Sequence, residues 1–357
     1  MKLREDAVYD LIAVTSMGVR ITPFSRQPVA TSNLFEMQAT SAETNVLNIA
    51  ASLGMRTTIL TRFVKDSPIA SFIMSELRKR NIGYFGEEVE QGGPWGYRHQ
   101  FNIADSGFGF RAPKVQNDRA GEVGRTIDYH DYDLDFIFKQ QGCKLLHLSG
   151  LVAALSESTT EACLKIAEYA KENGSLISFD INYRASFWKD REDELHESFK
   201  KIASMADILI GNEEDFQLAL GIKGPEAGGN DLSSKIDGFK VMINEVQKEY
   251  PNASVYGTTL REVASANEHY WGAIINYDGQ WYVEQPRQIQ VLDRIGGGDG
   301  FVGGLLYGIV KGFDPESCLH FGWASGAMAA SLLSDYASPL NEDEIWSIYQ
   351  GNARVQR

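Results

Sequence analysis

The sequence lacks a long apolar run. A helix that spans a bilayer needs about 18 or more consecutive apolar residues, and no such run occurs in the 357 residues of the chain. The first residues, 1–6, are mostly charged and lead into no apolar segment of the kind that a signal peptide carries. We therefore expect a cytoplasmic protein with no membrane partner.

Cysteine is scarce. The three cysteines, Cys143, Cys163 and Cys318, lie far apart in the sequence. They form no CxxC pair, and no histidine stands near them at the spacing of a metal ligand. We expect reduced thiols with a structural role.

Basic residues are outnumbered by acidic ones. The chain has 34 Lys and Arg against 48 Asp and Glu, which gives a formal net charge of −14. General binding to nucleic acid or to an anionic membrane needs a basic surface, so both are excluded as expected partners. A phosphate ligand is not excluded, because backbone N–H groups and a few arginines can hold it locally.

The composition that remains, 43% hydrophobic and 23% charged, is typical of a soluble globular protein. Short apolar runs typical of buried strands alternate with segments whose apolar residues recur at helical spacing. The strand-like runs are 9–14, 57–61, 145–149, 175–180 and 207–211, and the helix-like segments are 42–53, 68–80, 157–172 and 192–205. This alternation predicts an α/β fold, with a mostly parallel sheet and helices on both faces. We expect one such domain over 1–357.

Two segments, at 15–36 and 92–121, interrupt the alternation without the pattern of a crossover helix. Extended segments inserted after early strands suit a small β-sheet lid, since the substrate site of such a fold opens at the carboxyl ends of its strands. A lid sheet has edges to protect, and pairing with the lid of a second copy would protect them, which predicts a homodimer. A further segment, 221–232, is rich in glycine and polar residues and predicts a surface loop.

A glycine-rich turn precedes the apolar segment 301–310, which has the length of a helix. The turn consists of Gly296, Gly297, Gly298 and Asp299. Glycines let backbone N–H groups face a ligand, and a helix N-terminus adds positive potential, so the turn can form an anion hole for phosphoryl transfer. A carboxylate there can accept the proton of an attacking hydroxyl, as a general base. Taken alone, the pattern would equally be a tight turn with Asp299 as the helix cap.

The segment 293–308, DRIGGGDGFVGGLLYG, resembles the C-terminal signature D-T-x-G-A-G-D of the ribokinase (PfkB) family of carbohydrate kinases. Its Asp-Arg-x-Gly-Gly-Gly-Asp form is similar to the 2-keto-3-deoxygluconate kinase branch, as is 178–184, which resembles D-x-N-x-R. The segment 211–216 resembles the N-x-x-E motif, with Asp215 in place of Glu. Other segments that resemble this branch are 111–119, 258–263 and 353–357. The resemblance runs nearly end to end and implies a ribokinase-like fold with a β-sheet lid.

By position, the resemblance implies roles in a kinase that uses ATP and Mg²⁺. Asp299 would be the catalytic base, with Gly296, Gly297 and Gly298 as the anion hole. The nucleotide-binding residues would be Asn212, Thr258, Thr259, Arg261 and Gly298, and the residues that act on Mg²⁺ indirectly, through Mg-ATP, would be Asn212 and Asp215. Read without the family, 212–215 is equally an acidic helix N-terminus, and Thr258 and Thr259 are equally strand residues.

Two arginines, Arg119 and Arg184, lie in segments that resemble the segments with which the ketodeoxygluconate kinases bind the phosphoryl acceptor. The planar guanidinium fork suits a carboxylate, so the pair favours a sugar acid, with 2-keto-3-deoxygluconate as the leading candidate and a primary hydroxyl as the acceptor. Each arginine alone would be a surface charge. The residues expected at the acceptor are Ser16, Thr40, Ser41, Asn45, Asn117, Arg119 and Arg184.

The N-terminal half departs from the family pattern. Thr15 and Ser16 stand where Gly-Glu or Gly-Asp is usual, Thr40 and Ser41 replace paired glycines, and Asn117 replaces a tyrosine. The added side chains would narrow the space for a sugar hydroxyl or offer it new partners. Two alternatives therefore stay open: a kinase for another hexose, pentose or sugar acid, or a catalytically weak sugar-binding sensor.

Overall fold

The computed structural model of the protein describes residues 1–223 and 232–354. The middle of the expected surface loop, 224–231, and the last residues of the segment 353–357 lie outside the described residues. Within the described ranges, no helix is long and apolar enough to cross a membrane.

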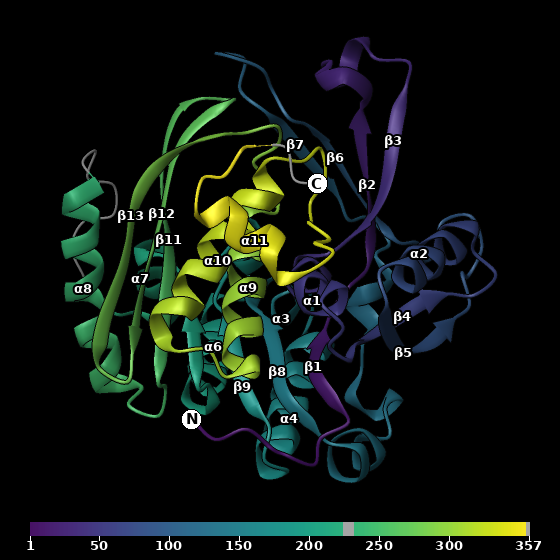
Figure 1. Cartoon of the computed structure of the whole chain (residues 1–357). Coiled ribbons are helices and arrows are strands. Elements are labelled where there is room, and N and C mark those ends of the chain that lie inside the picture. The colour runs from purple at the N-terminus through teal and green to yellow at the C-terminus, as the bar shows by residue number, and fades with distance from the viewer. Residues whose placement is uncertain (224–231, 355–357) are drawn as a thin grey trace.

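A nine-stranded sheet forms the centre of the molecule, in the order β13-β12-β11-β10-β9-β8-β1-β4-β5 (Figure 1). Its strands are parallel from β5 across to β11, and β11, β12 and β13 form an antiparallel meander at one edge. The strands are β1 (Tyr9–Val14), β4 (Thr57–Val64), β5 (Ile82–Val89), β8 (Cys143–Ser149), β9 (Leu176–Asp180), β10 (Ile208–Ile210), β11 (Val255–Ser265), β12 (Glu268–Tyr277) and β13 (Gln280–Gln290).

Helices cover both faces of this sheet. Five of the described helices lie on one face: α1 (Ala42–Ser52), α2 (Pro68–Lys79), α9 (Gly297–Lys311), α10 (Pro315–Ala330) and α11 (Glu342–Tyr349). The opposite face and its rim carry α3 (Gly150–Ala153), α4 (Glu157–Glu172), α5 (Ala185–Trp188), α6 (Glu192–Met205), α7 (Glu213–Leu220) and α8 (Leu232–Glu249). The predicted α/β class is confirmed.

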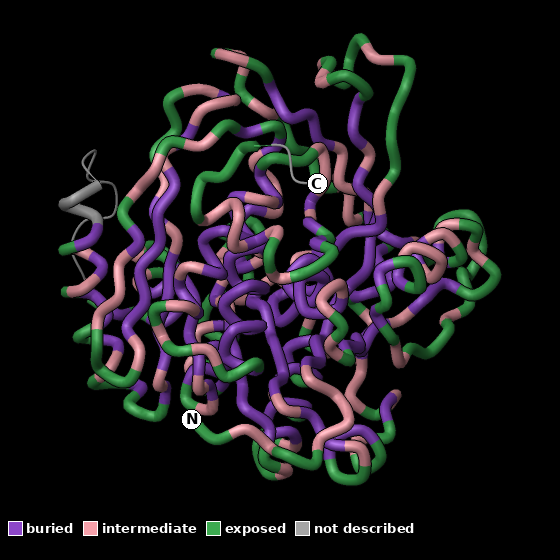
Figure 2. Tube along the Cα trace, viewed as in Figure 1, coloured by how far each residue is buried: buried purple, intermediate pink, exposed green. Residues whose placement is uncertain are grey.

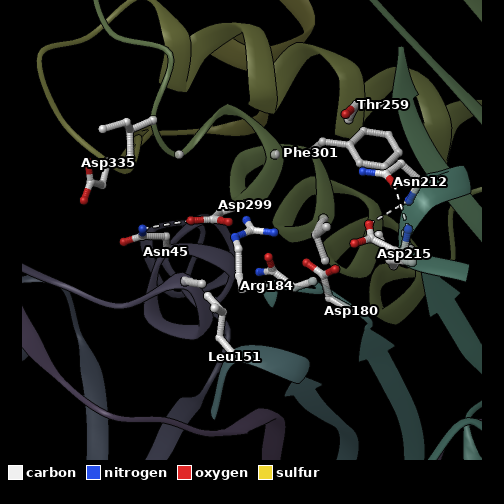
Figure 3. A pocket seen from close by; sticks show the side chains of 18 of the residues that line it. Asn45, Leu151, Asp180, Arg184, Asn212, Asp215, Thr259, Asp299, Phe301 and Asp335 are labelled. Carbon is white, nitrogen blue, oxygen red and sulfur yellow. Dashed lines mark hydrogen bonds between the residues drawn. The ribbon is translucent and has the colours of Figure 1, made fainter. Parts of the chain in front are cut away.

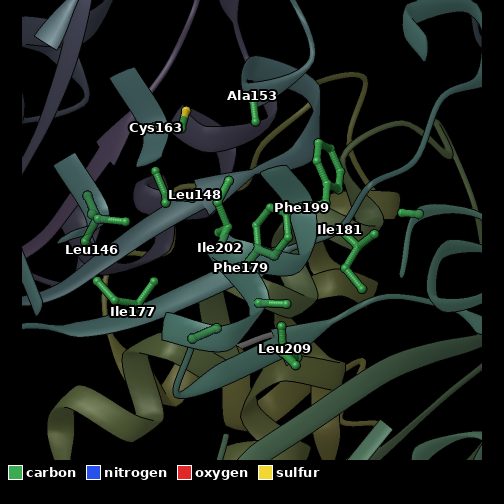
Figure 4. Close-up of a cluster of buried hydrophobic side chains, with 14 of the residues drawn as sticks. Leu146, Leu148, Ala153, Cys163, Ile177, Phe179, Ile181, Phe199, Ile202 and Leu209 are labelled. Atoms are coloured by element: carbon green, nitrogen blue, oxygen red, sulfur yellow. The ribbon is translucent and has the colours of Figure 1, made fainter. Parts of the chain in front are cut away.

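The core follows the two-residue period of the strands. In β8, Leu145 belongs to the cluster under α1 and α9, whereas Leu146 belongs to the cluster under α4 and α6. Figure 4 shows the second cluster, in which strand side chains meet Phe199 and Ile202 of α6. Burial is concentrated along the sheet and the helix surfaces that face it (Figure 2). Continuous apolar runs are expected of strands that are covered on both faces.

A second sheet of four strands, in the order β3-β2-β6-β7, stands beyond the carboxyl end of β1 (Figure 1). Its strands are β2 (Gly18–Pro23), β3 (Phe35–Thr40), β6 (Gln100–Asp105) and β7 (Lys114–Asp118). They come from the two segments expected to form a lid, although β3 continues to Thr40, past the expected limit at residue 36. We call this sheet the lid.

The two faces of the lid differ in polarity, because the strand register sorts its side chains. Residues on the inner face are mostly polar, and they include Arg20, Gln38, Thr40, Gln100, Asn102 and Asn117. Residues on the outer face are mostly apolar, and they include Ile21, Phe35, Met37, Phe101 and Ile103. The polar face is the one that contributes to the cavity described below.

Candidate active site

A cavity of about 790 Å³ is lined by residues from the lid and from the carboxyl ends of the central strands (Figure 3). Almost all of the predicted site residues line it: Thr40, Ser41, Asn45, Asn117, Arg119, Arg184, Asn212, Asp215, Thr258, Thr259, Arg261, Gly296, Gly298 and Asp299. Ser16 and Gly297 do not. Segments that are far apart in the sequence therefore meet at one place, where the fold class leads us to expect a ligand site.

The glycine-rich turn forms the first turn of α9. Gly296 is the N-cap, has a φ of 82°, and makes no side-chain capping bond, so Asp299 is not the helix cap. A Cβ atom at Gly296 would lie 1.8 Å from the carbonyl oxygen of Asp335, so no other residue fits there without movement. The predicted helix at 301–310 thus begins earlier, at Gly297, because the glycines themselves adopt helical geometry.

The other two glycines of the turn have different surroundings. A Cβ atom at Gly298 would meet no atom within 4 Å, and Gly298 lines the cavity. A Cβ atom at Gly297 would instead contact the carbonyl oxygen of Gly326 at 3.7 Å and the ring of Trp271 at 3.8 Å. Gly296 and Gly298 thus line the cavity, whereas the Cα of Gly297 faces α10 and Trp271, and the anion-hole role expected of the three glycines stays a prediction.

Asp299 lies in this turn with its carboxylate toward Asn45 of α1 (Figure 3). Asn45 donates a hydrogen bond from Nδ2 to Oδ2 of Asp299 at 2.9 Å. Burial, with smaller contributions from the nearby carboxylates of Asp335 and Glu43, raises the pKa of Asp299 to about 7, against the opposing effect of the Asn45 bond. A carboxyl group that titrates near neutral pH has the property of a general base.

The predicted Mg²⁺-nucleotide residues form the start of α7. The side chain of Asn212 accepts a hydrogen bond from the N–H of Asp215, and Oδ2 of Asp215 accepts one from the N–H of Asn212, both at 2.9 Å. Oδ1 of Asp215 accepts a third bond from the N–H of Tyr183. The interpretation as a helix N-terminus is thus correct, and both residues also line the cavity.

Asp180, at the end of β9, is a cavity residue that the sequence-based site prediction omitted. Burial and the neighbouring Asp215 and Asp299 raise its pKa well above the usual range. Among the described residues its carboxylate has no hydrogen bond and no ion pair, and in Figure 3 it lies between Arg184 and Asp215. Its position at the carboxyl end of a predicted parallel strand was the signal that could have identified it.

A second omitted residue, Arg294, gives the cavity a positive region together with Arg261 of β11. Neither guanidinium has an ion pair or a hydrogen bond with any described residue, and both line the cavity. Burial, and to a smaller extent the positive charge of Arg294, lower the pKa of Arg261 to about 10. Burial and both arginines lower the pKa of His269, on the neighbouring strand β12, to about 4. This region therefore offers positive charge without a protein counter-anion, as an anion site requires.

The two arginines predicted to hold an acceptor carboxylate are not equivalent. Arg119 donates to Oε1 of the buried Glu122 at 2.6 Å, and its guanidinium lies 5.1 Å from the ring centre of Phe187. Arg184 is exposed and lines the cavity, and among the described residues its side chain donates one hydrogen bond, to the carbonyl of Tyr183 at 2.7 Å. The charge of Arg119 is largely neutralised within the protein, whereas that of Arg184 is available to a ligand.

Four residues that depart from the family pattern carry hydroxyl groups, and these hydroxyl groups form hydrogen bonds within the protein. Ser16 donates to Glu122 at 2.5 Å, which explains why it lies behind the cavity lining. Thr15 donates to the buried Glu43 at 2.6 Å, and Thr40 donates to Asp335 at 2.7 Å. Ser41 is the N-cap of α1. The hydroxyl groups of Thr15, Ser16 and Thr40 therefore already donate to carboxylates of the protein, and of these three residues only Thr40 lines the cavity.

Comparisons with known proteins agree with this geometry. Residues 139–341, more than half of the chain, match the family model described as pfkB family carbohydrate kinase. A 5-dehydro-2-deoxygluconokinase from Clostridium perfringens is 25% identical over 91% of this chain and 88% of its own length. The structure of 2-dehydro-3-deoxygluconokinase from Thermotoga maritima is similar with a TM-score of 0.86 and 26% identity, covering 96% of this chain and 100% of that one. An Escherichia coli structure named ribokinase II, solved with ATP and Mg²⁺, shares the fold with a TM-score of 0.74 and 17% identity, over 96% of this chain and 100% of that one.

Proposed function

The chain belongs to the pfkB family of carbohydrate kinases, which are phosphotransferases, and from this premise we propose that it transfers a phosphoryl group from ATP to a primary hydroxyl of a sugar acid, with 2-keto-3-deoxygluconate as the leading candidate. The observation that carries the proposal is the position of Asp299, in the first turn of α9 and in the same cavity as the guanidinium of Arg184. Burial raises the pKa of this carboxyl to about 7.

In the proposed reaction Asp299 accepts the proton of the acceptor hydroxyl. The oxygen of that hydroxyl forms a new bond to the γ-phosphorus as the bond between this phosphorus and the bridging oxygen of ADP breaks. Negative charge on the transferred group is stabilised by the start of α9 at Gly296 and Gly298 and by the unpaired cations Arg261 and Arg294. Asn212, Thr258 and Thr259 bind the nucleotide in this proposal.

The cavity also fits a Mg²⁺ ion that arrives with the nucleotide. Mg²⁺ takes one or two carboxylates together with water and phosphate oxygens, and the unpartnered carboxylate of Asp180 faces the cavity near Asp215. Asp215 itself is occupied by two backbone N–H groups, so its role would be to hold the start of α7 in place. When bound, the ion would neutralise charge on the phosphates.

Arg184 is the residue that we propose as the main partner of the acceptor carboxylate. It has no ion pair among the described residues, whereas Arg119 already has Glu122. A guanidinium paired with a carboxylate out of water contributes about 1.5–3 kcal/mol. The Clostridium and Thermotoga relatives are named for acids of the keto-deoxy sugar type, which supports the class of acceptor but not one member of it.

A coupled assay of ADP release over a panel of sugars and sugar acids tests the proposal. We expect a sugar acid to be the best acceptor and Asp299→Asn to lower kcat at least about a hundredfold, the scale for loss of a positioned base. Arg184→Ala should raise the KM for the acid about ten- to a hundredfold, and Arg119→Ala should raise it less. If a neutral sugar were clearly the best acceptor, the carboxylate assignment would be wrong and the kinase assignment would stand. Tight binding of a sugar without turnover would favour a sensor.

We also propose a homodimer formed through the outer face of the lid. That face carries Phe35 and Met37 on the edge strand β3, with exposed fractions of 41% and 43%. Apolar side chains on an exposed edge strand are a feature that proteins usually cover.

A further inference from the structure

Arg20 is buried beside the catalytic turn, although it belongs to the lid. It lies on the inner face of β2, and 1% of its side chain is exposed. Its guanidinium forms ion pairs with Asp293 and with Asp335, whose side chains are 0% and 3% exposed. One nitrogen of the planar fork contacts each carboxylate, an arrangement that a lysine cannot reproduce.

The first of these carboxylates shapes the turn that leads to Asp299. The second oxygen of Asp293, Oδ1, accepts a hydrogen bond from the N–H of Ile295 at 3.0 Å. The next residue is Gly296, the N-cap of α9, whose Cα faces the carbonyl oxygen of Asp335. Arg20 therefore pairs with Asp293, which precedes the turn, and with Asp335, which packs against Gly296 of the turn.

The second carboxylate leads to Asp299 by a separate route. Oδ2 of Asp335 accepts a hydrogen bond from the hydroxyl of Thr40 at 2.7 Å. The Thr40 oxygen in turn accepts a bond from Nδ2 of Asn45 at 3.5 Å, and the same Nδ2 donates to Asp299 at 2.9 Å. Two continuous routes thus join one side chain of the lid to the catalytic carboxylate.

A contribution to folding stability is by itself a weak explanation for the buried ion pairs of Arg20 with Asp293 and Asp335. A buried ion pair loses so much hydration free energy that apolar replacements are often equally stable, whereas removal of one partner leaves uncompensated buried charge. Here the loss of Arg20 would leave two buried carboxylates without a cation. One of them, Asp335, is among the groups that face Asp299, together with Asn45 and Glu43 of α1, Asp180 of β9 and Arg184.

We propose that Arg20 is a positioning residue for phosphoryl transfer: its guanidinium, presented by the lid, fixes the turn before Asp299 and the Thr40–Asn45 contact, so that the lid and the catalytic turn keep one relative position. The proposal rests on the proposed kinase function. It assigns to Arg20 no contact with either substrate, because Arg20 does not line the cavity.

Arg20→Ala tests the proposal, with Arg62→Ala as a matched control. Arg62 forms a two-contact ion pair with Asp131, is 19% exposed, and does not line the cavity. Since a small misplacement at a reacting centre lowers rates about a hundredfold, we expect that loss of kcat in Arg20→Ala, with the KM for ATP changed less than about threefold. Arg62→Ala should lower the melting temperature and keep kcat within about twofold of the parent.

Chemical rescue separates positioning from general stability. Guanidinium chloride, far below denaturing concentrations, should restore kcat of Arg20→Ala at least about tenfold, because the free ion can bridge Asp293 and Asp335. Potassium chloride at equal ionic strength should not. A kcat close to that of the parent, or a loss that guanidinium leaves unrepaired, would overturn the proposal.

Two further measurements cover other outcomes. If Arg20→Ala does not fold, Arg20→Lys keeps the charge but not the fork, and we expect kcat about tenfold below the parent; a parental kcat would refute the assignment.

Hydrogen exchange at the amide of Ile295 can be measured without a sugar substrate. It should be faster in the folded Arg20 variant than in the parent and in Arg62→Ala, and equal rates would overturn the coupling even if no sugar were ever phosphorylated. A parent that phosphorylates nothing would contradict the proposed function alone.

Discussion

At the scale of single residues, the chemistry of the cavity depends on which charged groups already have a partner. Arg119 is neutralised by Glu122, and Asp215 is held by backbone N–H groups. Arg184 and Asp180 face the cavity and have no ion pair within the part of the chain that the structure describes. Residue type alone would not distinguish Arg119 from Arg184, or Asp215 from Asp180, because the type of a residue gives its charge but not its partner.

The pH dependence of turnover follows from Asp299. Only the deprotonated carboxylate can accept a proton, and burial raises its pKa to about 7, so kcat/KM for the acceptor should fall as the pH decreases through about 7. The bond from Asn45 stabilises the charged form and lowers this pKa. Asn45→Ala should therefore move the acidic limb to higher pH. Profiles of kcat/KM for both proteins would check this, and coincident acidic limbs would contradict it.

The glycines of the turn give a matched pair of variants. An alanine methyl at Gly298 would enter the cavity, whereas at Gly297 it would make ordinary contacts with Trp271 and Gly326. We expect Gly298→Ala to lower kcat at least about tenfold more than Gly297→Ala does, because the methyl lies where the transferred group must approach the turn. Steady-state kinetics on both variants, with calorimetry of acceptor binding, would test this. Equal losses would mean that the turn acts only as a structural element.

At the scale of elements, the site depends on how closely α1 approaches α9. A Cβ atom at Gly303 of α9 would lie 2.4 Å from the carbonyl oxygen of Val46 in α1. Val46 follows Asn45, the partner of Asp299, so this close contact sets the distance between the two site residues. Sequence periodicity predicts both helices but not the gap between them.

Gly303→Ala should separate the two helices. Overpacking of this kind destabilises a protein by about 1–3 kcal/mol, and we also expect a lower kcat because Asn45 moves relative to Asp299. Denaturant unfolding and kinetics on the same preparation would measure both effects. A variant with parental stability and kcat would show that the helices can move apart without consequence for the site.

At the scale of the whole molecule, the lid presents a polar face to the cavity and an apolar face outward. We expect Met37→Glu, which places a charge on the outer face, to convert a dimer into a monomer. Sedimentation velocity would measure the change. Leu340→Glu, at an apolar residue that is 83% exposed and outside the lid, serves as the control and should leave the assembly unchanged. A parent protein that sediments as a monomer would refute the dimer.

The sequence by itself determined the alternation of strands and helices, the interrupting segments that became the lid, and the glycine-rich start of α9. These features are local, since period, capping residues and glycine act within a few positions of the chain. The helices 157–172 and 192–205 accordingly match α4 and α6 at both ends. The glycine-rich turn placed Asp299 among the site residues, the family resemblance added Asn212 and Arg261, and the cavity contains all three.

Only the tertiary structure decided the partners of the charged groups. That Ser16 bonds Glu122, that Gly297 faces α10, and that Arg20 of the lid pairs with Asp293 and Asp335 all depend on contacts between segments distant in sequence. A side chain's pKa and availability depend on burial and on the charges within a few ångströms. No periodicity along the chain encodes these distances, because they are set by the packing of whole elements on one another.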